Sequence, residues 1–397
     1  DYVGTAKLEQ TKIDEKLKEE GLQVRLDSFI DPSLVRRIEG VIRGMLAEKG
    51  YLDGRVSHEV KDVGGGPKVV HLTFNISEGP QYKISDIEFV GNQAISDGKL
   101  AGKMKTNKKT WFFSFITGRG TYLQDKFEED AETLVEYYRD RGYIAARVDQ
   151  PEVKTLEDAT DGKTRYVQLR IPVREGNRYR VGEFDFEGNT VVKSEGLRPL
   201  FKVKSGDFYA EKHIRKGLEK AREVYGSGGY FEFTGYPDLK PRDQPDPADP
   251  NAANGASASA APAAPVGPPI VDVVMRMQEG KQYFVNRLTF LGNNTTRDNV
   301  IRREVRLFES GVFNTEALKY SVKRLNQLGY FKNLEGDAIK VDKTPNTDNK
   351  VDVTLKFEEQ NRNQLTFGAG VSQYDGFFGQ LSFQTANFMG RGETLTL

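Results

Sequence analysis

The chain has 397 residues, and its 58 basic side chains balance its 58 acidic ones. This balance gives no bulk attraction to nucleic acid, and the absence of cysteine excludes disulfides and thiolate metal sites while tolerating an oxidising compartment. No apolar run is long enough to span a bilayer as a helix.

A recurring phrase, Phe-x-Gly-Asn, divides the chain into repeats. Complete copies stand at residues 89–92, 186–189 and 290–293, and a shortened copy stands at residues 2–4. The copies lie roughly 90 to 100 residues apart, much farther than the units of a solenoid. Each repeat is therefore expected to be a small independent domain.

All repeats share one internal order of elements. An apolar strand ends at Gly-Asn, and a stretch with helical periodicity then closes on a Gly-Tyr pair. Two alternating strands follow. Each repeat closes on an acidic residue, and these residues are Glu78, Glu175, Glu279 and Glu359. This order predicts a β-α-α-β-β domain in which two helices cover one face of a three-stranded sheet, an α+β fold.

In chain order, repeat 1 is expected over residues 1–80, repeat 2 over 81–177, repeat 3 over 178–281 and repeat 4 over 282–360. Repeat 1 starts at the end of its first strand, so further sequence is expected upstream. Residues 241–269 consist almost wholly of Ala, Pro, Gly, Asp, Asn and Ser, which predicts a mobile insertion between the two return strands of repeat 3.

The tail, residues 361–397, changes character. From Asn363 the helical pattern stops, and apolar residues alternate with small or polar ones in segments of about ten residues. Such segments are typical of transmembrane barrel strands, and two and a half of them predict the start of an incomplete β-barrel. One more soluble hairpin is the alternative.

The residues that usually carry chemistry are scarce. His58 and His71 lie in the two strands of one hairpin, but strand parity directs their rings to opposite faces, so no metal site is predicted. The chain has no nucleophile elbow, phosphate-binding loop, dinucleotide fingerprint or zinc-protease motif. We therefore expect neither an enzyme nor a cofactor.

The repeats resemble POTRA domains, and the whole chain apart from the insertion resembles the BamA family, the outer-membrane protein assembly (insertase) family of Gram-negative bacteria. The resemblance rests on residues 111–118 and 137–143 in repeat 2, on residues 302–304 and 325–331 in repeat 4, and on the Asn-aromatic-x-Gly-x-Gly turn at residues 387–392. By this resemblance the repeats correspond to POTRA domains two to five.

The resemblance implies a protein of the cell outer membrane whose POTRA region lies in the periplasm. Its implied partners are unfolded outer-membrane proteins, accessory outer-membrane lipoproteins and periplasmic chaperones. By motif position, Arg302, Glu304 and Glu309 are expected to bind a lipoprotein; Arg302 and Glu309 as a plain pair on one helix surface are the alternative.

The unfolded outer-membrane proteins, called clients below, are expected to be held by backbone pairing at open sheet edges. Such pairing is largely indifferent to the sequence of the client. The candidate edge strands are residues 144–149, with Ala146 and Val148, and residues 230–234, with Phe231 and Phe233. Merely solvated edges are the alternative. The candidate gate is the first tail strand, whose apolar residues are Leu365, Phe367, Ala369 and Val371.

Two other functions remain open. One is a translocation-assembly or two-partner secretion transporter of the same superfamily, although four repeats favour the insertase. The other is a soluble docking scaffold that carries POTRA domains but no barrel.

Overall fold

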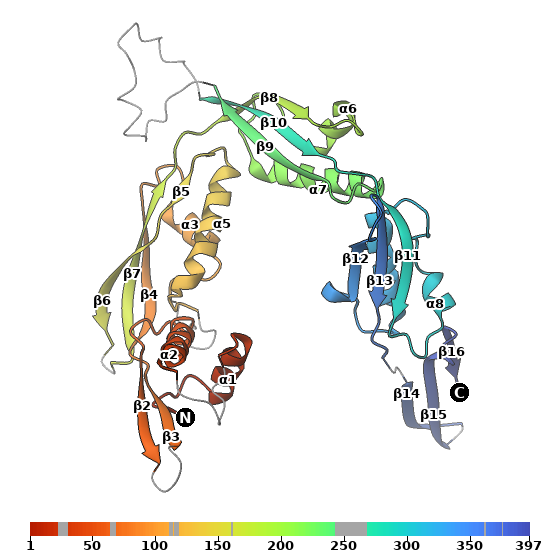
Figure 1. Ribbon diagram of the computed structural model, residues 1–397, viewed down its shortest axis with the longest axis horizontal. Coiled ribbons are helices and arrows are strands. Elements are labelled where there is room, and N and C mark those ends of the chain that lie inside the picture. Colours follow the sequence, from red (N-terminus) through yellow and green to blue (C-terminus); the bar gives the residue numbers. More distant parts are fainter. Residues whose placement is uncertain are drawn as a thin grey trace. The chain divides into compact units, whose positions relative to one another are not determined.

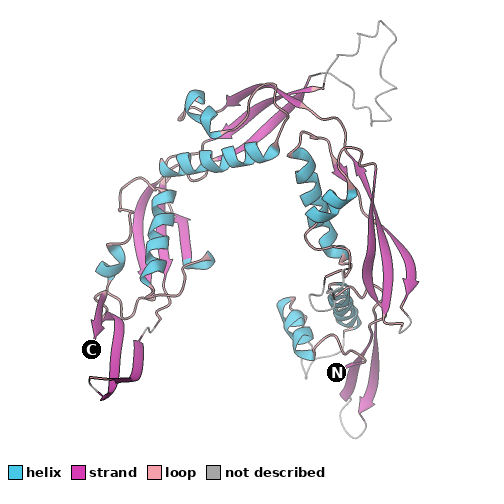
Figure 2. Cartoon of the chain, turned by 180° about the vertical axis from the view of Figure 1, so that it is seen from behind, coloured by secondary structure: helices cyan, strands magenta, loops and turns pink. Residues whose placement is uncertain are grey.

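The computed structural model describes residues 1–22, 31–63, 69–110, 114, 119–159, 162–242, 268–360, 363–374 and 376–397. The chain divides into two compact units, which are described separately. Unit 1 holds repeats 1 and 2, and unit 2 holds most of repeat 3, repeat 4 and the tail. Helices lie along one face of the sheet in each repeat (Figures 1 and 2).

Unit 1 contains two sheets. The elements of repeat 1 are β1 (Tyr2–Val3), α1 (Gln10–Glu19), α2 (Pro32–Ala47), β2 (Arg55–Val63) and β3 (Val69–Ser77). The elements of repeat 2 are β4 (Gln81–Val90), α3 (Asp97–Lys103), the 3₁₀ turn η1 (Gln124–Lys126), α5 (Phe127–Arg139), β5 (Arg147–Val148), β6 (Glu152–Asp158) and β7 (Thr164–Arg174).

Unit 2 contains three sheets. The elements of repeat 3 are β8 (Arg180–Glu187), α6 (Ser194–Leu197), η2 (Arg198–Leu200), α7 (Glu211–Ser227), β9 (Thr234–Pro241) and β10 (Ile270–Gln278). The elements of repeat 4 are β11 (Phe284–Leu291), α8 (Asp298–Arg302), α9 (Thr315–Leu328), η4 (Gly336–Ala338), β12 (Ile339–Lys343) and β13 (Lys350–Lys356). The tail has β14 (Asn363–Ser372), β15 (Gly376–Phe388) and β16 (Glu393–Thr396).

The strand order confirms the predicted repeat. In repeats 1, 3 and 4 the last strand lies between the other two, in the orders β1-β3-β2, β8-β10-β9 and β11-β13-β12. Repeat 2 differs only in that both β5 and β6 pair with the central β7. The first strand runs parallel to the last, as in β4 and β7, and the return strand runs antiparallel to it, as in β12 and β13.

The glycine of Phe-x-Gly-Asn is required by a close approach of two strands. Gly91 and Gly292 have φ values of 93° and 86°. A Cβ atom on Gly91 would lie 2.3 Å from the carbonyl oxygen of Val173, and one on Gly292 would lie 2.1 Å from that of Phe357. The first strand thus leaves the sheet in a left-handed turn directly against the central strand, where only glycine fits.

The glutamate at the end of each repeat closes this turn. Glu279 accepts hydrogen bonds from the backbone N–H groups of Thr190 and Val191, at 2.9 and 3.0 Å, and from the Tyr225 hydroxyl at 2.6 Å. Burial opposes its ionisation, but these hydrogen bonds outweigh burial and hold the pKa of Glu279 below its usual range. The corresponding glutamates of the other repeats, which bind the same turn, are Glu78, Glu175 and Glu359.

In repeats 2 and 3 the return strand starts later than the sequence pattern predicts, because a turn follows the Gly-Tyr pair. The N–H of Ala146 donates to the carbonyl of Tyr143 at 3.2 Å, and the N–H of Phe233 donates to that of Tyr230 at 3.1 Å. The prediction of a strand at residues 230–234 is therefore wrong, since β9 begins at Thr234.

The predicted strand at residues 144–149 is likewise wrong for its first half. Only Arg147–Val148 forms β5, and Ala146 is a buried core residue at 2% exposure. Pro151, which lacks an N–H donor, separates β5 from β6. The outer strand beside β7 over most of its length is β6.

The insertion of repeat 3 joins two paired strands, as predicted. β9 and β10 are antiparallel, with Pro241 opposite Val271. Residues 243–267, on which the prediction of a mobile loop falls, lie outside the described residues, as do residues 111–113 and 115–118 of the repeat 2 motif.

Candidate interaction surfaces

The predicted lipoprotein-binding residues lie close together in sequence but differ in setting. Arg302 is the last residue of α8, and its guanidinium lies 5.3 Å from the centre of the Phe290 ring. Glu304 is half-buried and pairs with Arg324 at 3.2 Å. Glu309 is exposed and accepts a hydrogen bond from the N–H of Leu288 at 3.1 Å.

The alternative of a plain helix-surface pair is wrong, because α8 ends at Arg302 and Glu309 lies in the segment before α9. This segment carries Phe308, whose side chain is 74% exposed. Arg306, two residues earlier, stacks on Tyr320 at 3.8 Å. Sequence reasoning missed Phe308, and the signal that could have found it is an aromatic residue outside both helical patterns.

The edge of repeat 4 is the best-formed candidate for strand addition. Among the described strands, β12 pairs with β13 alone and is the outer strand of its sheet. A groove between β12 and α9 is lined by the apolar residues Leu318, Val322 and Ile339 and by the polar residues Lys319, Lys323, Asn326 and Gln327. An extended segment added to β12 would meet backbone donors on one side and this apolar groove on the other.

The predicted edge residues of repeats 2 and 3 are mostly buried or packed. Val148 is half-buried against the core of repeat 2. Phe233 stacks on Tyr225 with ring centres 4.2 Å apart, and Phe231 packs edge-on against Tyr283 at 4.8 Å. These side chains fill the interior and the junction with repeat 4, so they leave little free surface for a client.

Within the part of the chain that the structure describes, the tail strand β14 is paired on one side, with β15. Its apolar residues form one exposed face: Phe367 is 78% exposed, and Leu365, Ala369 and Val371 are also exposed. Phe367 lies opposite Leu381 of β15, which is exposed as well. The alternation predicted from the sequence is therefore present, with the apolar side chains on one face of the strand and exposed Thr366 on the other.

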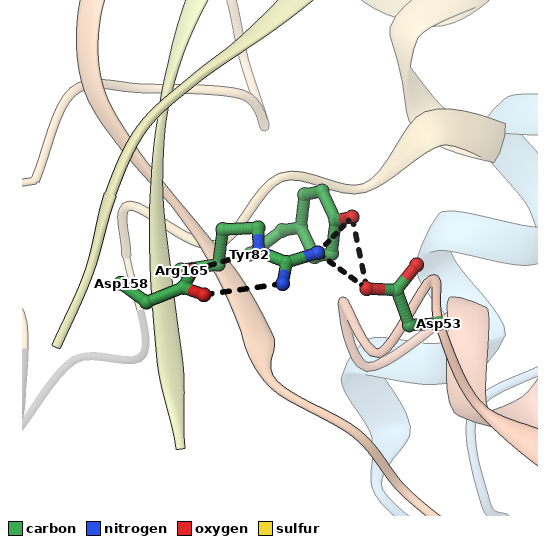
Figure 3. Close-up of polar contacts among 4 residues, drawn as sticks. All are labelled: Asp53, Tyr82, Asp158 and Arg165. Atoms are coloured by element: carbon green, nitrogen blue, oxygen red, sulfur yellow. Dashed lines mark hydrogen bonds and ion pairs between the residues drawn. The ribbon is translucent and has the colours of Figure 1, made fainter. Parts of the chain in front are cut away.

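A polar cluster joins repeats 1 and 2 (Figure 3). The Arg165 guanidinium contacts the carboxylates of Asp53, at 2.6 Å, and Asp158, at 2.7 Å. The Tyr82 hydroxyl donates to Asp53 at 3.2 Å and accepts from Arg165 at 3.1 Å. The hydrogen bond from Arg165 holds the pKa of Asp158 below its usual range. Repeat 1 contributes Asp53 and repeat 2 the other three.

A similar cluster of a tyrosine, a carboxylate and a cation joins repeats 3 and 4. The Tyr283 hydroxyl donates to Glu232 at 2.8 Å, and Lys343 of β12 forms an ion pair with the same carboxylate. Hydrogen bonds from Lys343 and then Tyr283 lower the pKa of Glu232. Asp53 and Glu232 each stand three residues after the glycine of a Gly-Tyr pair. This shared position is the signal that sequence reasoning overlooked.

A backbone hydrogen bond accompanies each cluster. The N–H of Tyr82 donates to the carbonyl of Gly50, and that of Tyr283 donates to Gly229, both at 2.9 Å. The carbonyl of Tyr82 in turn accepts from Tyr122 at 2.9 Å. The glycine that follows the long helix of one repeat is thus hydrogen-bonded to the start of the next repeat.

Other kinds of site find no support in the part of the chain that the structure describes. No three metal-ligating side chains gather there, and no helix there has the length and apolar character needed to cross a bilayer. His58 contacts Glu39 at 2.8 Å and His71 contacts Asp1 at 2.7 Å. The register places His58 opposite Phe74 and His71 opposite Lys61, so the two rings lie on opposite faces, as predicted.

Comparison with known proteins identifies the family. The model of the POTRA family, described as a surface antigen variable number repeat, matches residues 1–79, 82–176, 179–251 and 283–360. The chain is 30% identical over 397 residues to the outer membrane protein assembly factor BamA of Neisseria meningitidis serogroup B, covering 99% of this chain and 45% of that protein. It is 24% identical over 369 residues to BamA of Nitratidesulfovibrio vulgaris, covering 92% and 42%.

A solved structure of a related protein has the same fold. The POTRA3–5 part of Haemophilus influenzae BamA superposes with a TM-score of 0.52 at 21% identity, covering 70% of this chain and 96% of that one, which shows the shared fold. The chain belongs to the POTRA family, and its relatives place it among the BamA-family proteins. It spans about half the length of the curated relatives it matches.

Proposed function

We propose that this chain is the periplasmic part of an outer-membrane β-barrel protein insertase. The observation that carries the proposal is the tail sheet, which follows repeat 4 directly and has one apolar, exposed face, while β14 pairs with β15 alone among the described strands. An apolar face of this kind suits the lipid of the outer membrane, and the free edge suits an incoming strand.

The repeats receive unfolded outer-membrane proteins, delivered by periplasmic chaperones, by adding a client strand to an open sheet edge. The β12 edge of repeat 4 supports this best, because its backbone groups adjoin the groove of Leu318, Val322 and Ile339. Backbone pairing explains how clients of unrelated sequence share one site, while the groove accepts every second side chain of the added strand.

Accessory lipoproteins bind the surface of repeat 4 that carries Arg302, Glu304, Phe308 and Glu309. Phe308 supplies an exposed aromatic anchor at 74% exposure, and the charged residues Arg306 and Glu309 lie within two residues of it in the chain. Aromatic and arginine residues commonly dominate the binding energy of protein interfaces. Replacing Phe308 with Ala should therefore weaken lipoprotein capture more than replacing Lys340, an exposed residue of β12 outside this surface.

Photocrosslinking in the membrane-embedded protein during client assembly tests the proposal. A photoreactive residue replaces Phe367 on β14, Lys340 on the β12 edge, or Arg170, which is exposed on the central strand β7. Client adducts at Phe367 and Lys340, with none at Arg170, are expected. Adducts at Lys340 alone would overturn the insertase in favour of a docking scaffold, and equal adducts at all three positions would overturn strand addition.

A further inference from the structure

The turn between β15 and β16, residues 387–392, has an unusual backbone. Asn387 and Met389 have φ values of 57° and 52°, and Gly390 and Gly392 have values of 69° and 75°. Non-glycine residues rarely adopt positive φ, and such conformations persist only where surrounding contacts hold them. Within the turn, the Asn387 carboxamide accepts a hydrogen bond from the N–H of Gly392 at 2.8 Å.

The turn contacts repeat 4 at three points. The N–H of Arg297 donates to the carbonyl of Gly390 at 3.0 Å. The Asn387 side chain donates to the hydroxyl of Thr296 at 2.8 Å. The Tyr330 hydroxyl donates to the carbonyl of Gly392 at 3.1 Å. Two of these bonds reach the turn that follows the Gly-Asn phrase of repeat 4, residues 293–297.

The same segment of repeat 4 is also held by the residue that closes the repeat. Glu359 accepts hydrogen bonds from the N–H groups of Thr295, at 3.0 Å, and Thr296, at 2.7 Å. Glu359 lies four residues before β14 begins at Asn363. Residues 293–297 are therefore bonded both to the chain entering the tail sheet and to the turn that follows its second strand.

Contact at this point leaves no room for a side chain on Gly390. An added Cβ atom would lie 1.9 Å from the carbonyl oxygen of Thr295. Gly376, at the start of β15, has nearly the same φ value of 70°, yet nothing lies within 4 Å of its added Cβ. The two glycines share a conformation but differ in contact, so they form a matched pair.

We propose that the 387–392 turn is a positioning element that fixes the tail sheet to repeat 4 and thereby sets the orientation of the free edge of β14. Three hydrogen bonds to two separate segments of repeat 4 restrict rotation, whereas an apolar contact alone would let the sheet slide. The geometric part of this inference stands alone. The statement that the orientation matters for client assembly rests on the proposed function.

Distance measurement between two nitroxide labels tests the geometry. The chain has no cysteine, so Lys323→Cys on α9 and Gln380→Cys on β15 introduce the only two labelling sites. In detergent, the otherwise unchanged chain is expected to give one narrow distance distribution. Gly390→Ala should broaden it, and Gly376→Ala should leave it narrow. A broad distribution without further substitution, or equal widths for the two variants, would overturn the proposal.

A second variant covers the case in which Gly390→Ala disturbs folding. Asn387→Asp keeps the acceptor for the N–H of Gly392 but loses the donor to Thr296. It should broaden the distribution less than Gly390→Ala, while amide exchange in repeat 4 stays unchanged. An unchanged distribution would contradict the role of the Asn387 side chain.

Client assembly separates this inference from the proposed function. Gly390→Ala should lower the yield of client adducts at Phe367, and Gly376→Ala should not. If the unsubstituted protein gives no adducts at Phe367, the proposed function fails while the label distances still test the geometry. If adducts form equally in both variants, the insertase stands, and the statement that the orientation of β14 matters for client assembly is overturned.

Discussion

At the scale of single residues, the Phe-x-Gly-Asn phrase is explained by three linked requirements. The glycine permits the close approach of two strands, the asparagine side chain closes the turn, and the terminal glutamate holds it. In repeat 4 the Asn293 carboxamide donates to the carbonyl of Thr296 at 3.0 Å and to Asp298 at 2.9 Å. The phrase therefore marks a structural turn. Its recurrence is explained by the repeated fold and does not require a catalytic or binding role.

Gly292→Ala should destabilise repeat 4 well beyond the effect of positive φ alone. A left-handed conformation costs a non-glycine residue roughly 1–2 kcal/mol, and the Cβ atom would also press on the carbonyl of Phe357. Gly336→Ala is the control, because Gly336 has positive φ and nothing within 4 Å of its added Cβ. Hydrogen exchange of repeat 4 amides measures both; equal losses of protection would contradict the close-approach explanation.

Glu279→Gln should destabilise repeat 3 at neutral pH and have less effect in acid. The folded pKa of Glu279 is depressed, so its contribution is present above the unfolded value of about 4.3 and is lost as pH falls through the folded pKa. Exchange of repeat 3 amides, corrected for intrinsic rates, should show the difference between the Glu279→Gln variant and the parent chain shrinking below about pH 4. A constant difference would show that the charge does not matter.

Tyr225→Phe tests the contribution of the Tyr225 hydroxyl separately from the contribution of the charge on Glu279. The variant keeps the buried ring but removes the 2.6 Å hydrogen bond to Glu279. A loss of about 1–2 kcal/mol in the free energy of unfolding of repeat 3 is expected, because the buried carboxylate loses a donor. Exchange of repeat 3 amides measures this loss, and Tyr236→Phe, an exposed tyrosine of β9, is the control.

At the scale of elements, the order of strands and helices could be predicted, but the start of the return strand could not. Apolar alternation cannot distinguish Phe231 and Phe233 in a strand from the same two residues around a turn, because both arrangements bury every second side chain. The turn after Gly-Tyr depends on a backbone hydrogen bond, which composition does not reveal. The β12 groove was also missed, since it forms only when α9 packs beside the edge.

Phe367→Lys should reduce association of the chain with lipid vesicles, whereas Thr366→Lys should not. The two residues are neighbours on β14 and point to opposite faces, and the face of Phe367 is the apolar one. A lysine on a lipid-facing strand position costs roughly 2–4 kcal/mol near the middle of a bilayer. Vesicle flotation compares the variants; equal flotation would mean that this face does not contact lipid.

At the scale of the molecule, neighbouring repeats within each unit are joined by a tyrosine, a carboxylate and a cation. Residues Asp53, Tyr82 and Arg165 serve repeats 1 and 2, and residues Glu232, Tyr283 and Lys343 serve repeats 3 and 4. The number of repeats could be predicted from the sequence, because the phrases mark each one. The contacts between them could not, since their partners lie as far as 112 residues apart.

Arg165→Met should loosen the contact between repeats 1 and 2 without unfolding either. Methionine keeps much of the side-chain volume but removes the bonds to Asp53 and Asp158. Nitroxide labels on α2 and α5 should give a broader distance distribution than in the unsubstituted chain. Arg170→Met, on the same strand but with ion-pair distances of 3.7 and 4.0 Å, is the control; equal broadening would contradict the assignment.

The hydrogen bond between the Gly-Tyr pair of one repeat and the first strand of the next has a consequence for how such chains change in length. Repeats 1 and 3 each carry a carbonyl acceptor just after the long helix, at Gly50 and Gly229, and the repeat that follows begins with the matching N–H donor, at Tyr82 and Tyr283. The acceptor and its donor therefore stand at the same positions of the repeat at both junctions. Duplication or deletion of a whole repeat would therefore keep this backbone acceptor and its donor in place at the new junction.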